Sequence, residues 1–155
     1  MNHDLKIVVI LMAEDDADDR LLVKEAFAES HVANSLHFVG DGIELLDYLH
    51  GRGEYSNRDT FPFPDLLLLD LNMPRKDGRE ALKEIKVDPR LKKLPAVVLT
   101  TSKADEDILR SYDLGAAGFI TKPVTFESLV EIIKGLGEYW VQIVKLPSKD
   151  KKGNT

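Results

Sequence analysis

Four consecutive leucines, Leu66 to Leu69, are followed directly by Asp70, and the chain then enters a loop that contains Pro74 and Gly78. A strand that is apolar at every position, without alternation, is buried on both faces, which is typical of parallel sheets. The carboxylate at its end lies at the edge of the sheet, where ligands of open α/β proteins bind. The run therefore predicts a parallel sheet and makes Asp70 a candidate functional residue.

Short apolar runs alternate with stretches of helical periodicity along the chain. We expect five strands, over Ile7–Met12, Ser35–Val39, Leu66–Asp70, Ala96–Thr100 and Gly118–Thr121. We expect five helices, over Asp18–Ser30, Ile43–His50, Glu80–Lys86, Asp105–Leu114 and from a cap at Thr125 to about Val144. This alternation predicts an α/β fold, a doubly wound five-stranded parallel sheet with helices on both faces. In the flavodoxin-like order 2-1-3-4-5, the first and third strands are neighbours where the winding reverses, and ligands bind beyond their carboxyl ends.

Two segments carry more detailed expectations. The residues of the first helix that we expect to face the core are Leu21, Leu22 and Ala26, with Val23 or Phe27 as further candidates. The segment Gly51–Pro64 carries glycines and prolines among polar residues, so we expect an exposed loop there.

The composition indicates a soluble protein of ordinary size. The 155 residues are long enough to bury a core, and we expect one domain over 1–146 with a flexible tail over 147–155. A net charge of −6 argues against nucleic acid as a partner, because phosphate binding needs a basic surface. The apolar run near the N-terminus, Ile7–Met12, is too short to span a membrane. The chain has no cysteine, which fits the reducing cytoplasm where we expect the protein to act.

Acidic residues follow the first expected strand, in the run Glu14-Asp15-Asp16. Carboxylates about 4 Å apart repel by roughly 1 kcal/mol in water and by about 4 kcal/mol at an effective dielectric constant of about 20. Gathering Glu14 and Asp15 with Asp70 at one sheet edge therefore requires a cation, and Mg²⁺ suits oxygen ligands of this kind. We expect Asp15, Asp70 and the backbone carbonyl of Asn72 to bind Mg²⁺ directly, and Glu14 to bind it through water.

Two residues at other strand ends suit phosphoryl transfer. A carboxylate such as that of Asp70 can attack phosphorus and form an acyl phosphate. The charge that spreads over the phosphoryl oxygens then has to be neutralised. Lys122, at the end of the fifth strand, supplies a cation, and Thr100, at the end of the fourth, supplies a hydroxyl donor. Together these residues predict a phosphoryl-accepting aspartate.

Each of these residues has an ordinary explanation when it is taken alone. The run Glu14-Asp15-Asp16 could only cap and charge the following helix, although Asp18 and Asp19 already stand at the start of that helix. Lys122 could be a solvated surface lysine, and Thr100 could reflect β-propensity. Four such signals at the ends of four different strands are hard to explain by chance, so we favour the phosphoryl acceptor.

In combination, these motifs resemble those of the receiver domain of two-component response regulators. The motifs are Glu14-Asp15, Leu69-Asp70-Leu71-Asn72-Met73-Pro74 with Asp77-Gly78, Thr100, Gly115-Ala116 and Thr121-Lys122-Pro123. The resemblance covers roughly Lys6 to Leu136. It implies that Asp70 accepts a phosphoryl group from a histidine kinase or a phosphotransfer protein.

The resemblance also implies roles for other residues. Glu14 and Asp15 correspond to the acid pair, Thr100 to the phosphate-sensing hydroxyl and Lys122 to the phosphate counter-ion. Phe119 corresponds to the switch aromatic, although a plain core phenylalanine is an alternative. A protein of this kind is a signalling switch and not an enzyme, because it promotes only its own phosphorylation and dephosphorylation and acts through protein contacts.

The C-terminal stretch from Gly137 to Pro147 resembles the tail of small stand-alone regulators that are paired with bacterial phytochromes. This resemblance implies a bacterial phytochrome as the kinase partner and a homodimer whose contact includes the last helix. Trp140 lies on an apolar stripe that extends beyond a usual receiver, and exposed aromatic residues mark interaction surfaces. The alternative is that the helix folds back over its own core.

Two other functions are alternatives for these residues. One is a Mg²⁺-dependent phosphohydrolase with an aspartate nucleophile, of the haloacid dehalogenase kind. Such enzymes need a second acid two residues after the nucleophile, where this chain has Asn72. The other is a flavin- or nucleotide-binding module on the same fold. No Gly-rich loop follows the first strand, and the acids between Glu14 and Asp19 would repel phosphate.

Overall fold

A five-stranded sheet in the order β2-β1-β3-β4-β5 forms the centre of the protein. The structure is a computed structural model that describes residues 7–71, 73–101, 118–122 and 125–135, with the backbone alone for 100–101 and 118–122. The strands are β1 (Val8–Ala13), β2 (Asn34–Val39), β3 (Leu66–Asp70), β4 (Ala96–Thr101) and β5 (Gly118–Lys122). All neighbouring strands are parallel. The strand order predicted from the sequence is confirmed.

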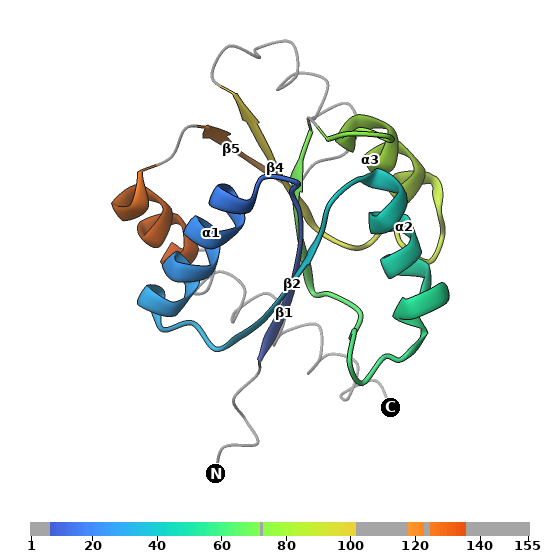
Figure 1. The fold of residues 1–155 in the computed structure, drawn as a ribbon, viewed down its shortest axis with the longest axis horizontal. Coiled ribbons are helices and arrows are strands. Elements are labelled where there is room, and N and C mark those ends of the chain that lie inside the picture. Colours follow the sequence, from blue (N-terminus) through green and yellow to red (C-terminus); the bar gives the residue numbers. More distant parts are fainter. Residues whose placement is uncertain (1–6, 72, 102–117, 123–124, 136–155) are drawn as a thin grey trace, which may run out of the picture.

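Helices cover both faces of this sheet (Figure 1). On one face lie α1 (Ala17–Ser30) and a helix over 126–135, and on the other lie α2 (Gly42–His50) and α3 (Gly78–Val87). The predicted cap of the last helix is confirmed, because Oγ1 of Thr125 accepts a hydrogen bond of 3.1 Å from the backbone N–H of Ser128. The predicted helix Asp105–Leu114, the predicted course of the last helix beyond residue 135, and the tail lie outside the described residues. Within the described part of the chain, no helix has the length and apolar character that a membrane span requires.

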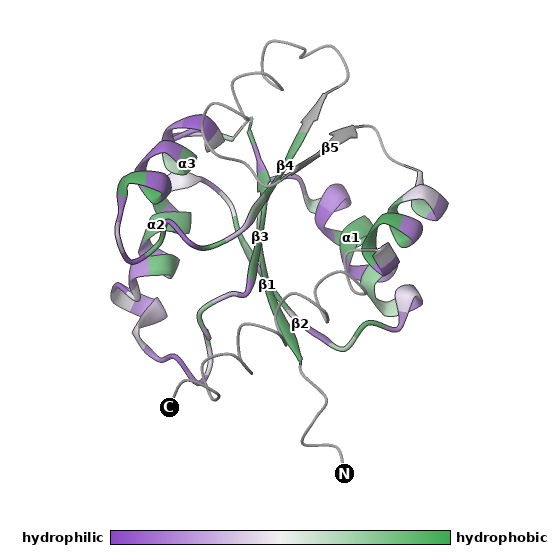
Figure 2. Ribbon diagram, turned by 180° about the vertical axis from the view of Figure 1, so that it is seen from behind, coloured by the Kyte–Doolittle hydropathy of each residue, from purple (hydrophilic) through white to green (hydrophobic). Residues whose placement is uncertain are grey.

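The sheet separates two apolar cores. Leu11 and Ala13 of β1 belong to the core beneath α2 and α3, whereas Ile10 and Met12 belong to the core beneath α1. Every residue of β3 is buried. Figure 2 shows β1 and β3 mostly in hydrophobic colours, between helices that carry both hydrophilic and hydrophobic residues. The prediction that an uninterrupted apolar strand is covered on both faces is confirmed.

One residue that we predicted to face the core from α1 does not do so. Leu21 is 53% exposed, whereas Val23, Ala26 and Phe27 are buried and Leu22 is partly buried. Leu21, Leu22 and Val23 are consecutive, and a helix can turn only part of such a run toward its sheet. The buried stripe follows Val23 and Phe27 at a spacing of four residues, and this stripe leaves Leu21 in solvent.

The segment Gly51–Pro64, predicted to be an exposed loop, is packed against α2 and contains a 3₁₀ turn, η2 (Gly53–Ser56). Tyr55 is buried, with its ring centroid 5.0 Å from that of Tyr48, and Phe61 packs edge-on against both rings. The guanidinium of Arg58 donates hydrogen bonds to the carbonyl oxygens of Tyr48 at 2.8 Å and Phe61 at 3.1 Å. Most positions of the segment are exposed, as predicted. The prediction missed the buried Tyr55 because it gave weight to glycine and proline and none to the aromatic side chains.

Replacing Leu69 with alanine is expected to lower the free energy of unfolding by about 2–5 kcal/mol, because its fully buried side chain would leave a cavity. The matched control, Leu21→Ala, removes the same atoms from an exposed position and should change the free energy of unfolding by less than about 1 kcal/mol. Urea denaturation followed by circular dichroism measures both values. Equal losses for the two variants would contradict the orientation of α1.

Candidate functional site

The carboxyl ends of β1 and β3 bring the predicted acidic residues together. Ala13 pairs with Leu69 in the parallel register, so the next residue of each strand, Glu14 or Asp70, stands at the same level of the sheet edge. Glu14, Asp15 and Asp70 each offer a carboxylate oxygen, and these three oxygens all lie within 4.8 Å of one another. Glu14 is fully buried and Asp70 is only 5% exposed, whereas Asp15 is exposed. Carboxylates this close and this buried differ from an ordinary solvated acidic surface.

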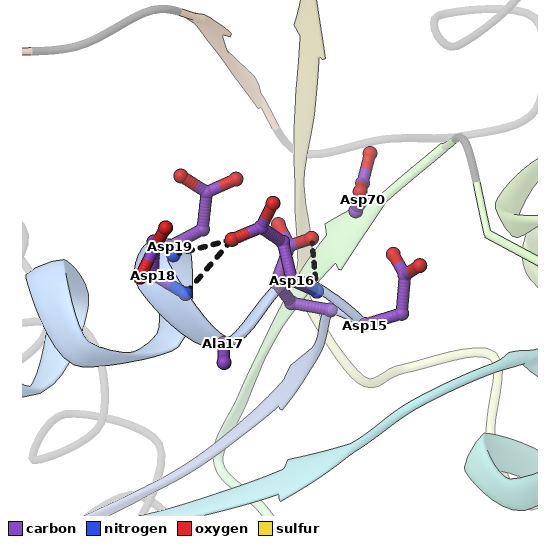
Figure 3. A pocket seen from close by; sticks show the side chains of 7 residues that line it. Asp15, Asp16, Ala17, Asp18, Asp19 and Asp70 are labelled. Carbon is purple, nitrogen blue, oxygen red and sulfur yellow. Dashed lines mark hydrogen bonds between the residues drawn. The ribbon is translucent and has the colours of Figure 1, made fainter.

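These carboxylates line an open pocket of about 480 Å³ (Figure 3). The pocket is lined by Glu14, Asp15, Asp16, Ala17, Asp18, Asp19 and Asp70. Figure 3 shows Asp70 at the end of β3 and Asp15 on the chain that leads from β1 into α1. Because like charges repel more strongly where water is partly excluded, this gathering is unfavourable without a counter-charge. A donor set of oxygens alone fits a hard divalent cation such as Mg²⁺.

Asp16 differs in role from its two neighbours, because it caps α1. Its Oδ1 accepts hydrogen bonds from the backbone N–H groups of Asp18 at 2.8 Å and Asp19 at 3.0 Å. Such a cap satisfies N–H groups of the first turn that have no partner within the helix. Asp18 and Asp19 lie in the first turn of the helix, as predicted, and Asp16 is its cap. The ordinary explanation of the acidic run therefore accounts for Asp16, but not for Glu14 and Asp15.

Arg20 holds the end of β1 in place, and the sequence analysis missed it. Its Nε donates a hydrogen bond of 2.6 Å to the backbone carbonyl of Glu14, and its guanidinium lies 5.3 Å from the centre of the Phe38 ring. The backbone N–H of Glu14 donates to the carbonyl of Val39 at 2.9 Å, and its Oε2 accepts from the N–H of Asp16 at 3.2 Å. A signal for Arg20 was present in the sequence, because it is the first cation after the acidic run.

The backbone register brings the ends of β4 and β5 to the same edge of the sheet. Thr100 follows the residue of β4 that pairs with Asp70. Lys122, the last residue of β5, pairs with the residue that follows Thr100. Phe119 lies three residues earlier on β5. Asn72, predicted to offer its carbonyl to a metal, lies outside the described residues.

The acidic pocket lies where the winding of the sheet reverses, which is where doubly wound folds of this strand order bind ligands. The family model for the response regulator receiver domain matches residues 10–134 of this chain. The chain therefore belongs to the response regulator receiver family.

Several members of this family are similar to this chain over nearly their whole length. Response regulator Rcp1 from Synechocystis sp. is 41% identical over 140 residues, which are 90% of this chain and 93% of that protein. A crystal structure of the phosphorylated cyanobacterial phytochrome response regulator RcpA has a TM-score of 0.78 and 46% identity, and covers 88% of this chain and 95% of its own. The Mn(2+)-bound form of Rcp1 has a TM-score of 0.74 and 40% identity, with coverages of 86% and 94%. The resemblance to regulators paired with phytochromes is confirmed.

Asp16→Ala is expected to lower the free energy of unfolding by about 1 kcal/mol, because α1 loses its cap. Asp15→Asn removes a charge from the pocket without removing a cap, so it should raise the unfolding temperature in metal-free buffer. It should also reduce the extra stability that added Mg²⁺ gives to the wild type. Calorimetry with a chelator and then with Mg²⁺ measures these differences. If Asp15→Asn destabilises the metal-free protein as much as Asp16→Ala does, the repulsion argument is wrong.

Proposed function

We propose that this receiver domain is a phosphorylation switch in which Asp70 accepts a phosphoryl group from a phosphohistidine of a sensor kinase or a phosphotransfer protein. The observation that carries the proposal is the convergence of Glu14, Asp15 and Asp70, whose oxygens lie within 4.8 Å of one another. Family membership supports it, because phosphorylation on aspartate is typical of response regulators.

In the proposed step, a carboxylate oxygen of Asp70 attacks phosphorus as the bond between phosphorus and the donor imidazole nitrogen breaks. The imidazole leaves with the electron pair of that bond and takes up a proton from solvent. Negative charge spreads over the phosphoryl oxygens in the transition state, so positioning and charge neutralisation provide the acceleration. In this proposal, Lys122 is the cation that neutralises the phosphoryl charge, and the hydroxyl of Thr100 donates a hydrogen bond to a phosphoryl oxygen.

Mg²⁺ is the proposed cofactor, held directly by Asp15, Asp70 and the backbone carbonyl of Asn72 and through water by Glu14. The pocket of oxygen donors supports this assignment, as does the Mn(2+)-bound structure of the relative Rcp1. When it is bound, a divalent cation neutralises the gathered carboxylates and the phosphoryl oxygens.

The proposed output is a change of surface that a partner protein recognises. Phosphorylation would bias two conformations through Thr100 and Phe119, and so change the surface around β4, β5 and the last helix. The protein would act in the cytoplasm as a single receiver domain over 1–146 with a flexible tail over 147–155. The description of the relative RcpA as a phytochrome response regulator supports a bacterial phytochrome as the kinase. We further propose a homodimer formed through the last helix, with Trp140 in the contact.

In the first test, the protein is incubated with Mg²⁺ and a small acyl phosphate, and the mass of the intact protein is measured. The wild type should gain one phosphoryl group and Asp70→Asn none, because the variant lacks the nucleophilic carboxylate. Lys122→Ala should slow the gain by roughly a hundredfold, the usual cost of losing one preorganised group that stabilises charge.

No added mass on the wild type, together with no binding of Mg²⁺, would refute the proposal. Steady turnover of a phosphomonoester substrate would favour the phosphohydrolase instead.

The second test measures mass by sedimentation at micromolar concentration. The wild type should sediment as a dimer, and Trp140→Ala should shift it toward monomer, because aromatic anchors contribute much of the binding energy of an interface. Val87→Ala, which changes an exposed apolar residue of α3, is the control and should remain a dimer. Monomer masses for all three proteins would exclude the dimer.

A further inference from the structure

The loop that joins Asp70 to α3 is bound at its tip to the start of α2. The backbone N–H of Gly42, the first residue of α2, donates a hydrogen bond of 2.8 Å to the carbonyl of Lys76. One residue earlier on each segment, Asp41 forms an ion pair with Arg75. These contacts join residues 34 apart in the sequence, and they lie outside the acidic pocket described above.

Arg75 has a backbone conformation that a residue with a side chain rarely adopts. Its φ is +62°, in the left-handed region, where the Cβ atom crowds the backbone. Among the described residues, the other non-glycine residue with positive φ is His31, which ends α1, a common place for this conformation. Arg75 ends no helix, so its conformation requires another cause.

The side chain of Arg75 is bound by the carboxylate of Asp41. Nε and Nη2 of Arg75 each lie 2.7 Å from Oδ2 of Asp41. Oδ1 of Asp41 accepts a hydrogen bond of 2.8 Å from the N–H of Glu44, so the same carboxylate also caps α2. Asp41 is 9% exposed. Burial raises the pKa of its carboxyl, but the hydrogen bonds from Glu44 and Arg75 outweigh that effect and leave the pKa below its usual range.

The loop also has little room to shift. A Cβ atom on Gly42 would lie 2.3 Å from the carbonyl oxygen of Lys76, and one on Gly78 would lie 2.4 Å from the carbonyl oxygen of Asp70. The N–H of Gly78 donates to the carbonyl of Leu71 at 2.9 Å. The segment is therefore held at its base against the backbone of Asp70 and at its tip against α2.

We infer that Asp41 and Arg75 are positioning residues for the phosphoryl-acceptor site. By holding Arg75 in the left-handed conformation, Asp41 fixes the loop whose other end, Gly78, lies against the backbone of Asp70, the proposed metal ligand and phosphoryl acceptor. This inference rests on the proposed function of Asp70.

The test compares the affinity for Mg²⁺ of the full chain and its variants, measured by titration calorimetry. Arg75→Ala and Asp41→Asn should each weaken binding by roughly tenfold, the scale expected when a group that orients a metal ligand is lost. Asparagine caps a helix as well as aspartate does, so Asp41→Asn removes the ion pair and keeps the cap. The double variant should bind no more weakly than the single variants, because both act through one pair.

Asp47→Asn is the matched control. Asp47 also lies on α2 and also pairs with an arginine, Arg52, at 3.2 Å. Asp47 and Arg52 line the same surface pocket as Arg75, so this variant changes the charge close to the loop without removing the partner of Arg75. The affinity of Asp47→Asn for Mg²⁺ should equal that of the wild type. If Asp47→Asn weakens binding as much as Asp41→Asn does, the effect is one of net charge and the inference is wrong.

Two further measurements separate positioning from general stability. Hydrogen exchange is measured without metal, under conditions in which Arg75→Ala and the wild type have the same free energy of unfolding. The amide hydrogen of Gly42 should then exchange faster in Arg75→Ala. Arg75→Gly should bind Mg²⁺ with an affinity between those of the wild type and Arg75→Ala, because glycine adopts positive φ without crowding. If Arg75→Ala does not fold, Arg75→Lys replaces it, and its single ammonium should give a smaller loss of affinity.

The outcomes distinguish this inference from the proposed function. A wild type that neither binds Mg²⁺ nor gains a phosphoryl group refutes the proposed function. The inference alone is refuted if the wild type binds Mg²⁺ and gains a phosphoryl group, and if Asp41→Asn and Arg75→Ala equal it in affinity for Mg²⁺ and in rate of phosphorylation.

Discussion

The parallel register between β1 and β3 does more than any other feature to place the functional residues. Because Ala13 pairs with Leu69, Glu14 and Asp70 reach the edge of the sheet at the same level. A slip of one residue would send every side chain of a strand to the opposite face. Both faces are packed with apolar side chains, so such a slip would disrupt two cores at once. Core packing, and not any attraction between the acids, therefore brings the carboxylates together.

Gathered carboxylates oppose folding, and the surrounding chain offsets that cost. Arg20 and Val39 hold the backbone of Glu14 through hydrogen bonds of 2.6 and 2.9 Å, and Asp16 fixes the start of α1. On Glu14 these two contacts use the backbone N–H and carbonyl, so they leave its carboxylate in the pocket of oxygen donors. Oxygen donors held in this way before a ligand arrives fit a divalent cation, as in other receiver domains.

The strands and their order could be predicted because apolar runs in a parallel sheet are short, continuous and separated by clear turns. The placement of Glu14 and Asp70 followed from topology alone. The orientation of Leu21 could not be predicted, since three consecutive apolar residues leave the phase of a helix open. The burial of Tyr55 was missed because the glycines and prolines of its segment were given weight and its ring contacts with Tyr48 and Phe61 were not foreseen.

The roles of Thr100, Lys122 and Phe119 stay predictions, although the backbone register brings Thr100 and Lys122 to the expected edge. The ion pair between Asp41 and Arg75 joins two loops that are 34 residues apart. No local pattern marks such a pair, and only the packing of α2 beside the loop after Asp70 reveals it.

The division of the interior into two cores has a consequence for how this family can diversify. Among the described residues, the core beneath α2 and α3 shares no member with the core beneath α1 and the helix over 126–135. Substitutions on one side therefore need few compensating changes on the other, since distant sites that share no partners act almost independently. Residues on one face of the sheet can change and allow a new partner to bind, while the packing on the opposite face is kept. A small domain can in this way acquire new recognition without rebuilding its interior.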